Sequence, residues 1–520
     1  MSYKTEIMKQ AHRIFFPLLL LTLLVSQGLL AQKITYSPTD KNEPRQTDFE
    51  IIGRYGNNFL VYKNYRSNPY ITVYDNDMQV KENVALTFMP EKEKIIETDF
   101  ISLPEHSYMF YQYQHKNVVY MMAVKIGPDG KNLSQPIELD TTHVNFFNSA
   151  ERIYSVLSSE DKKNFMVFRV NTKDEKKYIF KTLLYSSDMT LKHVTNVSLR
   201  MNDRNDFLTD FYLDNDGNLV FGRGVRPGIS ENINRFFLVI KHAEADSFAY
   251  GDLKLDNISM DEVKLRMDNA NNRYLFTGFY YKGKRAGSIE GIANAIYDKK
   301  SSEWVIKNTI PLGQELREDA KGDNNVRNAF DDYYIRQIII RKNGGFVVVA
   351  ESIYQTSRGG GSYNRWNSLY NPYSPGFDYY RYGAYSPYNR MGGSNIVRYH
   401  ADNIVIGAFD ADGRLSLSNT IRKSQYDDDD EAMVSYQLVN TGDALRFIYN
   451  DYEKRDIVLT YQSIDATGTV TRPPTLKNLD KGYNFLPRYS KQVSSKIVII
   501  PCIYRNFLGF AKLDFSEISQ

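Results

Sequence analysis

The feature that most constrains this chain is a hairpin pattern that recurs from one end of the sequence to the other. Residues 403–421 contain its clearest copy. An alternating apolar strand ends at Phe409, the sequence Asp-Ala-Asp-Gly can form a tight turn, and a second alternating strand begins at Leu415. Because the other copies have the same order of apolar strand, turn and weaker strand, the chain is predicted to repeat one sheet unit.

The spacing of the hairpins predicts units of similar size. Their final apolar residues are separated by 53, 60, 56, 57, 109 and 55 residues. The long separation contains an inserted segment, residues 355–402, and without these 48 residues it falls to 61. A period of roughly 40 to 60 residues made of strands is typical of propeller blades. The final residues are Leu86, Leu139, Leu199, Leu255, Leu312, Ile421 and Leu476.

Two further strands precede each hairpin, except in the last repeat. That repeat offers only three strands, Phe485–Tyr489, Lys496–Tyr504 and Phe507–Phe515, whereas Lys33–Ser37 is a spare strand near the other end of the chain. Pairing the spare strand with the last repeat would close a ring and remove its exposed edges. We therefore predict an all-β, eight-bladed β-propeller of four-stranded antiparallel blades, closed by an N-terminal strand.

Two alternatives stay open at this point. A seven-bladed ring would result if residues 49–86 or the C-terminal strands belonged elsewhere. Tandem sandwiches would require linkers rich in Pro, Gly or Ser, and none separates the repeats. The repeats resemble β-propellers in general, but they have no Trp-Asp blade ending, kelch double glycine or sialidase-type box. The resemblance therefore implies a fold and no activity.

The first residues are predicted to be a secretory signal peptide. Lys4, Lys9 and Arg13 precede an apolar run from Ile14 to Val25, and small residues follow it up to Ala31. We place the domains at 1–31 for the signal and 32–520 for one propeller. The apolar run is shorter than the roughly 20 residues that span a bilayer. The mature protein is therefore expected in the periplasm, at the cell surface or secreted, without a transmembrane anchor.

The composition argues against a nucleic-acid partner and against stabilisation by disulfides. The net charge of +3 lacks the basic excess of nucleic-acid-binding proteins, so no nucleic-acid partner is predicted. The chain contains 40 Tyr and 29 Phe, which suit half-buried strands. It contains one cysteine, Cys502, which lies in an apolar run, so we predict a buried structural thiol and no intrachain disulfide.

The inserted segment 355–402 is the candidate binding site. It carries nine tyrosines and five arginines among Gly, Ser, Asn and Pro residues that disfavour regular structure. Long loops in compact repeat proteins are often functional, and Tyr, Trp and Arg supply contact area at low entropic cost. The alternative is that the segment packs on acidic neighbours or stays mobile. The candidate residues are Tyr363, Arg365, Trp366, Tyr370, Tyr373, Tyr379, Tyr380, Arg381 and Tyr382.

Two acidic segments should lie on the same face as the insertion, because the loop between strands two and three of a blade opens beside the connectors. One is the connector 313–332, and the other is the run Asp427–Glu431. The run could offer oxygen ligands to Ca²⁺, but it is more typical of a solvated turn. None of the seven histidines has metal-ligand spacing. We therefore predict no metal site and no cofactor.

The sequence favours a binding protein over an enzyme. It contains no phosphate loop, nucleophile elbow or His-Glu-x-x-His motif. We expect an exported, non-enzymatic propeller of the bacterial cell envelope that engages a protein or glycan partner through one face. The alternative is a carbohydrate-active hydrolase or lyase with carboxylates at the channel mouth. Arg54, Arg266, Arg336 and Arg488 fall in predicted innermost strands and either face the channel or form ordinary salt bridges.

Overall fold

The structure is a computed structural model that describes most of the chain after residue 32. The described residues are 33–42, 44–91, 93–144, 152–174, 177–201, 205–228, 231–283, 287–321, 326–357, 384–385, 397–428, 431–453, 456–473 and 482–516. The candidate residues Tyr363, Arg365, Trp366, Tyr370, Tyr373, Tyr379, Tyr380, Arg381 and Tyr382 lie outside these ranges, as does the predicted signal peptide.

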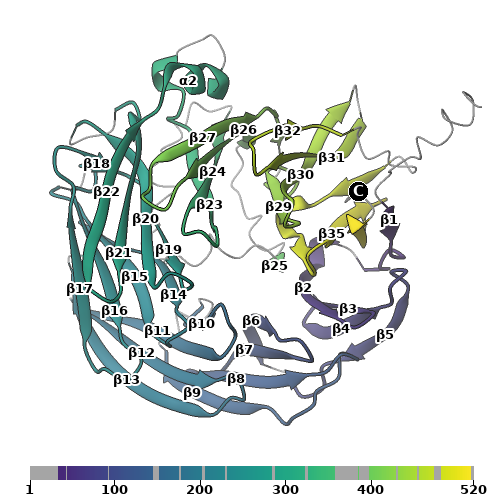
Figure 1. Ribbon diagram of the computed structural model, residues 1–520. Coiled ribbons are helices and arrows are strands. Elements are labelled where there is room, and N and C mark those ends of the chain that lie inside the picture. The colour runs from purple at the N-terminus through teal and green to yellow at the C-terminus, as the bar shows by residue number, and fades with distance from the viewer. Residues whose placement is uncertain are drawn as a thin grey trace, which may run out of the picture.

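Eight antiparallel sheets stand around a common axis, which confirms the eight-bladed propeller (Figure 1). The first four blades follow one another in chain order, each with its first strand innermost. The first blade contains β2 (Thr47–Tyr55), β3 (Asn58–Tyr65), β4 (Asn68–Tyr74) and β5 (Val80–Ala85), and the second contains β6 (Lys94–Ser102), β7 (Ser107–His115), β8 (Val118–Ile126) and β9 (Ile137–His143). The third blade contains β10 (Tyr154–Ser158), β11 (Asn164–Asp174), β12 (Lys177–Ser186) and β13 (Leu191–Arg200). The fourth contains β14 (Asp206–Leu213), β15 (Leu219–Val225), β16 (Arg235–Lys241) and β17 (Phe248–Lys254).

The later blades keep this order with short additional strands. Blades five to eight contain β18 (Ser259–Met260), β19 (Lys264–Asp268), β20 (Arg273–Tyr281), β21 (Gly291–Asp298) and β22 (Glu303–Pro311); β23 (Tyr333–Ile340), β24 (Phe346–Ser357), β26 (Val397–Phe409), β27 (Leu415–Ile421) and β28 (Tyr426–Asp427); β29 (Tyr436–Asn440), β30 (Ala444–Glu453), β31 (Asp456–Asp465) and β32 (Val470–Thr471); and β33 (Tyr483–Phe485), β34 (Lys491–Gln492), β35 (Ile497–Tyr504) and β36 (Phe507–Asp514). The 3-10 helices are η1 (Pro44–Gln46), η2 (Val326–Asn328) and η5 (Pro487–Tyr489).

The ring closes as the sequence predicts. Strand β1 (Lys33–Tyr36) pairs antiparallel with β36 and supplies the fourth strand of the last blade. In Figure 1 the purple start of the described chain lies beside the yellow last blade. The buried Lys63 of the first blade donates hydrogen bonds to Asp40, which follows β1, and to Tyr74 at 2.9 and 2.8 Å. This ion pair fastens the closing segment to the first blade as well as to the last.

The hairpin that defines the repeat has the predicted turn. Gly413 adopts φ +73°, a left-handed conformation that glycine accepts without strain. The Asp410 carboxylate accepts hydrogen bonds from the backbone N–H groups of Asp412 and Arg414 at 3.0 and 2.8 Å. The left-handed Gly413 and the Asp410 carboxylate together fix the direction in which β27 leaves the turn.

Corresponding turns of successive blades are bonded to each other. The backbone N–H of Asp161 donates to the Asn215 side chain at 3.2 Å, and that of Asn215 donates to Asn269 at 3.3 Å. Each pair is 54 residues apart, one blade period. The repeat is thus visible in hydrogen bonding as well as in strand order.

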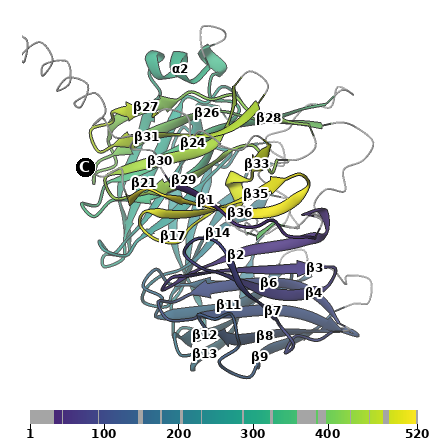
Figure 2. The same ribbon diagram turned by 90° about the vertical axis from the view of Figure 1, so that its right-hand side faces the viewer.

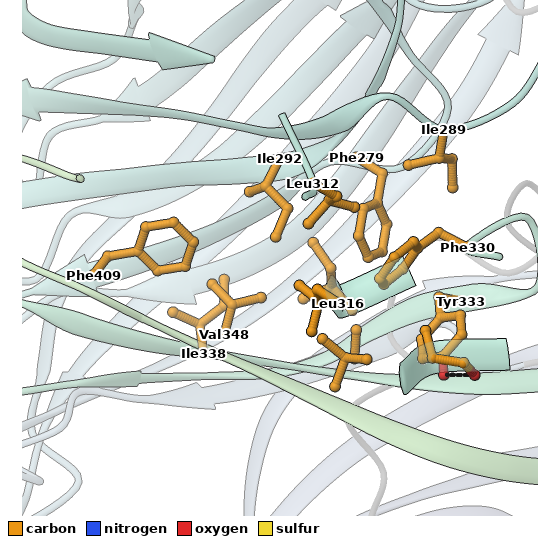
Figure 3. Packing of buried hydrophobic residues seen from close by; sticks show 14 of the residues in the cluster. Phe279, Ile289, Ile292, Leu312, Leu316, Phe330, Tyr333, Ile338, Val348 and Phe409 are labelled. Atoms are coloured by element: carbon orange, nitrogen blue, oxygen red, sulfur yellow. Dashed lines mark hydrogen bonds between the residues drawn. The ribbon is translucent and has the colours of Figure 1, made fainter. Parts of the chain in front are cut away.

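The blades are held together by apolar side chains between adjacent sheets. Figure 3 shows the cluster between the fifth and sixth blades, which includes Phe279, Ile292, Ile338 and Phe409. Burial of such side chains contributes about 25 cal/mol per Å² of apolar surface removed from water. Cys502 belongs to another such cluster and is buried, as predicted, and burial raises the pKa of its thiol.

The acidic connector between the fifth and sixth blades contains a helix that the sequence analysis did not predict. Helix α2 (Gln314–Lys321) turns Leu316 and Ala320 into the same cluster. The Tyr333 hydroxyl donates to the carbonyl of Ala320 at 2.9 Å, the dashed line in Figure 3. Two apolar contacts spaced four residues apart were too few to stand out from the acidic residues around them.

The last two blades depart most from the predicted strand limits. In the eighth blade, the strand predicted at Phe485–Tyr489 is Tyr483–Phe485, and Pro487–Tyr489 forms the 3-10 helix η5, because Pro487 has no N–H to donate to a neighbouring strand. In the seventh blade, the first strand begins at Tyr436, after Ser435, whose φ of +71° interrupts the extended backbone. Its hairpin was predicted to end at Leu476, but its outer strand is described only as Val470–Thr471, and residues 474–481 lie outside the described ranges.

Candidate functional site

The inserted segment begins and ends in two long strands of the sixth blade. Strand β24 extends to Ser357 and β26 begins at Val397, so both ends of the predicted insertion 355–402 are sheet. Within it, β25 (Ala384–Tyr385) pairs with the innermost strand β2 of the first blade, opposite Glu50 and Phe49. Figure 1 places β25 inside the ring of sheets. The insertion therefore reaches the central channel as well as the rim.

A ladder of rings crosses the root of this insertion. Tyr354 on β24 lies opposite His400 on β26, and His400 lies opposite Tyr426 on β28. The first pair stacks with ring centroids 4.4 Å apart and planes at 7°, and the second pair lies 6.4 Å apart. Directly opposed cross-strand residues have neighbouring Cβ atoms, so the strand register itself brings the rings together.

The ladder continues into the seventh blade. Tyr426 stacks on Tyr452 of β30 at 5.6 Å and 15°, and the Tyr452 hydroxyl donates to the backbone carbonyl of Tyr426 at 2.9 Å. Both tyrosines remain exposed, at 44% and 41%. We name Tyr354, Arg398, His400, Tyr426 and Tyr452 the aromatic platform. It presents rigid ring faces at the junction of two blades.

Arg398 adds a fixed positive charge to the platform. Its guanidinium lies 4.4 Å from the Tyr426 ring centroid and pairs with both carboxylate oxygens of Asp428, at 2.5 and 3.0 Å. The hydrogen bond to Asp428 raises the pKa of Arg398. A bidentate Arg–carboxylate pair held against a ring fixes the orientation of the guanidinium. This contact also joins Arg398, near the end of the basic insertion, to Asp428 of the acidic run. Packing of the insertion on acidic neighbours was the alternative prediction for that segment.

The other polar groups of the platform are also satisfied. The Tyr354 hydroxyl donates to Asp402 at 3.0 Å, and burial together with that carboxylate raises its pKa. His400 Nε2 lies 3.1 Å from the Thr356 hydroxyl. Burial lowers the pKa of His400, and Arg398 contributes in the same direction. At neutral pH the ladder is therefore a neutral imidazole between two phenols.

A buried charged cluster supports the platform from below. Lys423 contacts Glu351 at 2.8 Å and also donates to the carbonyl of Ala401 and to Gln425, at 2.6 and 2.7 Å. Ser435 donates to the other oxygen of Glu351 at 2.6 Å. These side chains are almost fully buried between the sixth and seventh blades. The hydrogen bond from Ser435, which precedes β29, connects this buried ion pair of the sixth blade to the seventh blade.

The four arginines predicted in innermost strands are bonded within the protein. Arg336 lies 3.6 Å from Glu351, and Arg488 pairs with Glu431. Arg266 donates to the carbonyl of Ile338 at 3.2 Å, and Arg54 donates to that of Gly56 at 2.9 Å.

The sequence predicted the acidic run and counted Arg398 among the five arginines of the insertion, but the rings of the platform were missed. Tyr354, Tyr426 and Tyr452 lie beyond the ends of the predicted strands, where a tyrosine is unremarkable. The signal that could have found them is the alternation of polar and aromatic residues beyond the apolar part of each strand, as in Tyr354 and Thr356 or Arg398 and His400. It indicates that the strands continue past the core.

In the described ranges no group of three or more His, Cys, Asp or Glu side chains is placed to hold a metal ion. No described helix has both the length and the apolar character to cross a membrane.

Comparison with known proteins gives the fold alone. No family model matches the chain, and no curated protein matches it in sequence. Solved structures match at low similarity. A puromycin hydrolase is 12% identical over 77% of this chain and 50% of its own, with a TM-score of 0.35. Dihydro-heme d1 dehydrogenase NirN is 9% identical over 93% and 78%, with 0.37, and prolyl oligopeptidase B from Galerina marginata is 9% identical over 89% and 56%, with 0.39. The chain thus spans about half the length of two of these enzymes.

Proposed function

We propose that this protein is an exported, non-enzymatic propeller of the bacterial cell envelope that binds a protein partner through the aromatic platform and the insertion rooted in it. The observation that carries the proposal is the exposed stack of Tyr426 on Tyr452 beside an oriented Arg398. Tyrosine and arginine dominate the energetic centres of protein interfaces. Export rests on the signal-like segment before residue 32.

The preformed geometry supports a recognition role. The rings are held by strand register and the guanidinium by a bidentate carboxylate, so little side-chain entropy remains to be lost on binding. The blades on either side are joined by Ser435, which precedes β29 of the seventh blade and donates to Glu351 on β24 of the sixth at 2.6 Å. A protein partner is favoured over a glycan because the described platform offers a charged guanidinium among tyrosines, and the chain has only 2 Trp, the usual sugar-stacking ring.

The test is photo-crosslinking in the envelope of the source bacterium. A photoreactive phenylalanine derivative replaces Tyr452 in one variant and Tyr250 in a control. Tyr250 is equally exposed, at 50% against 41%, but lies on β17 of the fourth blade. We expect a discrete adduct from position 452 and none from position 250, and we expect Tyr426→Ala to abolish the adduct. A glycan adduct would redirect the proposal, whereas equal labelling from both positions, or none, would refute it.

A second arm tests the insertion itself. Residues 358–396 are replaced by a short Gly-Ser linker, which leaves the paired ends of β24 and β26 intact. We expect a folded ring with a cooperative unfolding transition and no adduct at position 452. A deletion variant that still forms the adduct would confine recognition to the platform.

A further inference from the structure

We infer that the crevice between the second and third blades is a binding site for a small organic acid with an apolar body. The crevice lies on the face that carries the first-to-second and third-to-fourth strand turns, opposite the platform. Its cavity volume is about 840 Å³. This value falls within the range of about 300 to 1,000 Å³ that is usual for small-molecule sites.

The crevice has an apolar floor and apolar walls. Tyr108, Ala123 and Val124 from β7 and β8 are buried beneath it, and Leu103, Ile137 and Met189 stand around it. Ile137 is 43% exposed although it is a large aliphatic residue at the start of β9. An aromatic or aliphatic group placed here would cover apolar surface that the protein itself leaves open.

One cation in the crevice has no partner. Lys125, at the end of β8, forms no salt bridge or side-chain hydrogen bond with any described residue, although it is half-buried. Its backbone is fixed, because its N–H donates to the Ser134 hydroxyl at 3.2 Å and its carbonyl accepts from Leu133 at 2.7 Å. A half-buried ammonium on a fixed backbone is suited to an anionic group of a ligand.

A second side chain in the crevice, His106, also suits an oxygen atom of an anionic ligand. Nε2 of His106 is buried and has no hydrogen-bond partner in the described parts of the chain. The ring is held edge-on to Tyr108, with centroids 5.1 Å apart and planes at 84°. A neutral imidazole can donate one N–H, but Nε2 has almost no accessible surface, so a carboxylate oxygen facing Lys125 would accept this hydrogen bond after the ring turns toward the crevice.

The other charges of the crevice, apart from the exposed Glu105, are engaged within the protein, and Lys163 lies 3.7 Å from Asp161. Asp161 accepts from the Ser159 hydroxyl and the Lys163 N–H at 2.7 and 3.1 Å. Asp188 accepts from Ser186 and, at 3.2 Å, from the Thr190 N–H. The ammonium of Lys162 donates to Ser158 at 2.7 Å, and Glu105 is exposed at the rim. Nε2 of His106 and the ammonium of Lys125 are therefore the groups within the crevice that have no partner in the described chain and that a ligand could bind.

The test uses 4-phenylbutyrate, indole-3-acetate and octanoate in calorimetric titrations of the full mature chain. We expect saturable binding of at least one acid at one site. The uncharged 4-phenylbutan-1-ol should bind at least about tenfold more weakly than 4-phenylbutyrate, as the loss of one charge-assisted hydrogen bond implies. Lys125→Gln should weaken the acid by a similar factor and leave the alcohol unchanged.

Two further variants distinguish binding in the crevice from non-specific binding elsewhere on the protein. Ile137→Trp fills the mouth of the crevice from an exposed position, so it should abolish binding of acid and alcohol alike. Lys131→Gln, in the same blade, removes a lysine that pairs with Glu82 at 3.2 Å outside the crevice, and it should change nothing. No saturable binding by any of the three acids up to about 10 mM, a ceiling well above the roughly 1 mM Kd of a −4 kcal/mol ligand, overturns the inference. Equal binding by Lys125→Gln and the parent chain overturns it too.

Discussion

The platform between the sixth and seventh blades and the crevice between the second and third use the same residue types in opposite ways. Each combines a lysine and a histidine with tyrosine, of which the crevice has Tyr108 and the platform three. Under the platform, Lys423 has a carboxylate at 2.8 Å, and on it His400 meets the Thr356 hydroxyl at 3.1 Å. In the crevice, Lys125 and Nε2 of His106 have no such partners in the described chain. Internally paired groups build a rigid surface, whereas unpaired groups make a site that a ligand completes.

Replacement of the two lysines gives the largest expected contrast. Lys423→Met removes the cation nearest to the buried Glu351 and leaves it only Arg336 at 3.6 Å, which should lower the free energy of unfolding by about 3 kcal/mol. Lys125→Met removes an ammonium that nothing pairs with, so its effect should stay within about 0.5 kcal/mol. Urea denaturation of both variants measures the difference.

A double variant shows whether the loss comes from an unpaired charge. Lys423→Met with Glu351→Met removes both charges of the pair and keeps most of the side-chain volume, but it also takes a carboxylate from Arg336, so it should recover only part of the stability lost in Lys423→Met. If the double variant is less stable than the single one, the buried pair contributes more than the charge it neutralises. Equal stability of Lys423→Met and Lys125→Met would remove the proposed contrast.

Loss of ring stacking on the platform should have a smaller effect. Tyr426→Leu keeps an apolar side chain but removes the stack on Tyr452 and the contact with Arg398, so it should cost about 0.5 to 1.5 kcal/mol. Tyr250→Leu is the matched control, because it changes an exposed tyrosine of the fourth blade. Thermal unfolding of the two variants makes the comparison, and equal melting temperatures would show that the stack does not stabilise the blade junction.

The predictability of the fold and that of the two sites differ for a physical reason. Blade number, strand order and closure by Lys33–Tyr36 follow from a period and from alternation, which are local signals. The platform depends on register between strands, and the crevice depends on turns from two blades that meet only in the folded ring. Alternation beyond the core indicates that the strand of Tyr354 continues, but the pairing of Tyr354 with His400 and of His400 with Tyr426, and the absence of a described partner for Lys125, cannot be derived from the sequence.

The smallest expected effect distinguishes the two histidines by titration. Burial lowers the pKa of both from the usual 6.5, aided by Lys125 for His106 and by Arg398 for His400. As the pH falls below 6.5, the unfolded chain takes up protons that the folded chain resists, so the free energy of unfolding should decrease until the folded pKa values are passed. Histidine NMR signals, assigned with His106→Gln and His400→Gln, should titrate below 6.5.

Added 4-phenylbutyrate should move only one of these midpoints. Its carboxylate beside His106 favours the imidazolium and partly offsets Lys125, so the midpoint of His106 should rise. His400 lies at the other end of the blades, near Arg398 and Asp402, and its midpoint should stay where it was. A shift of both midpoints would mean that the acid acts on the whole ring, and a shift of His400 alone would place the anion at the platform. A rise confined to the midpoint of His106 would show that the ligand affects the unpaired imidazole in the crevice and leaves the paired imidazole of the platform unchanged.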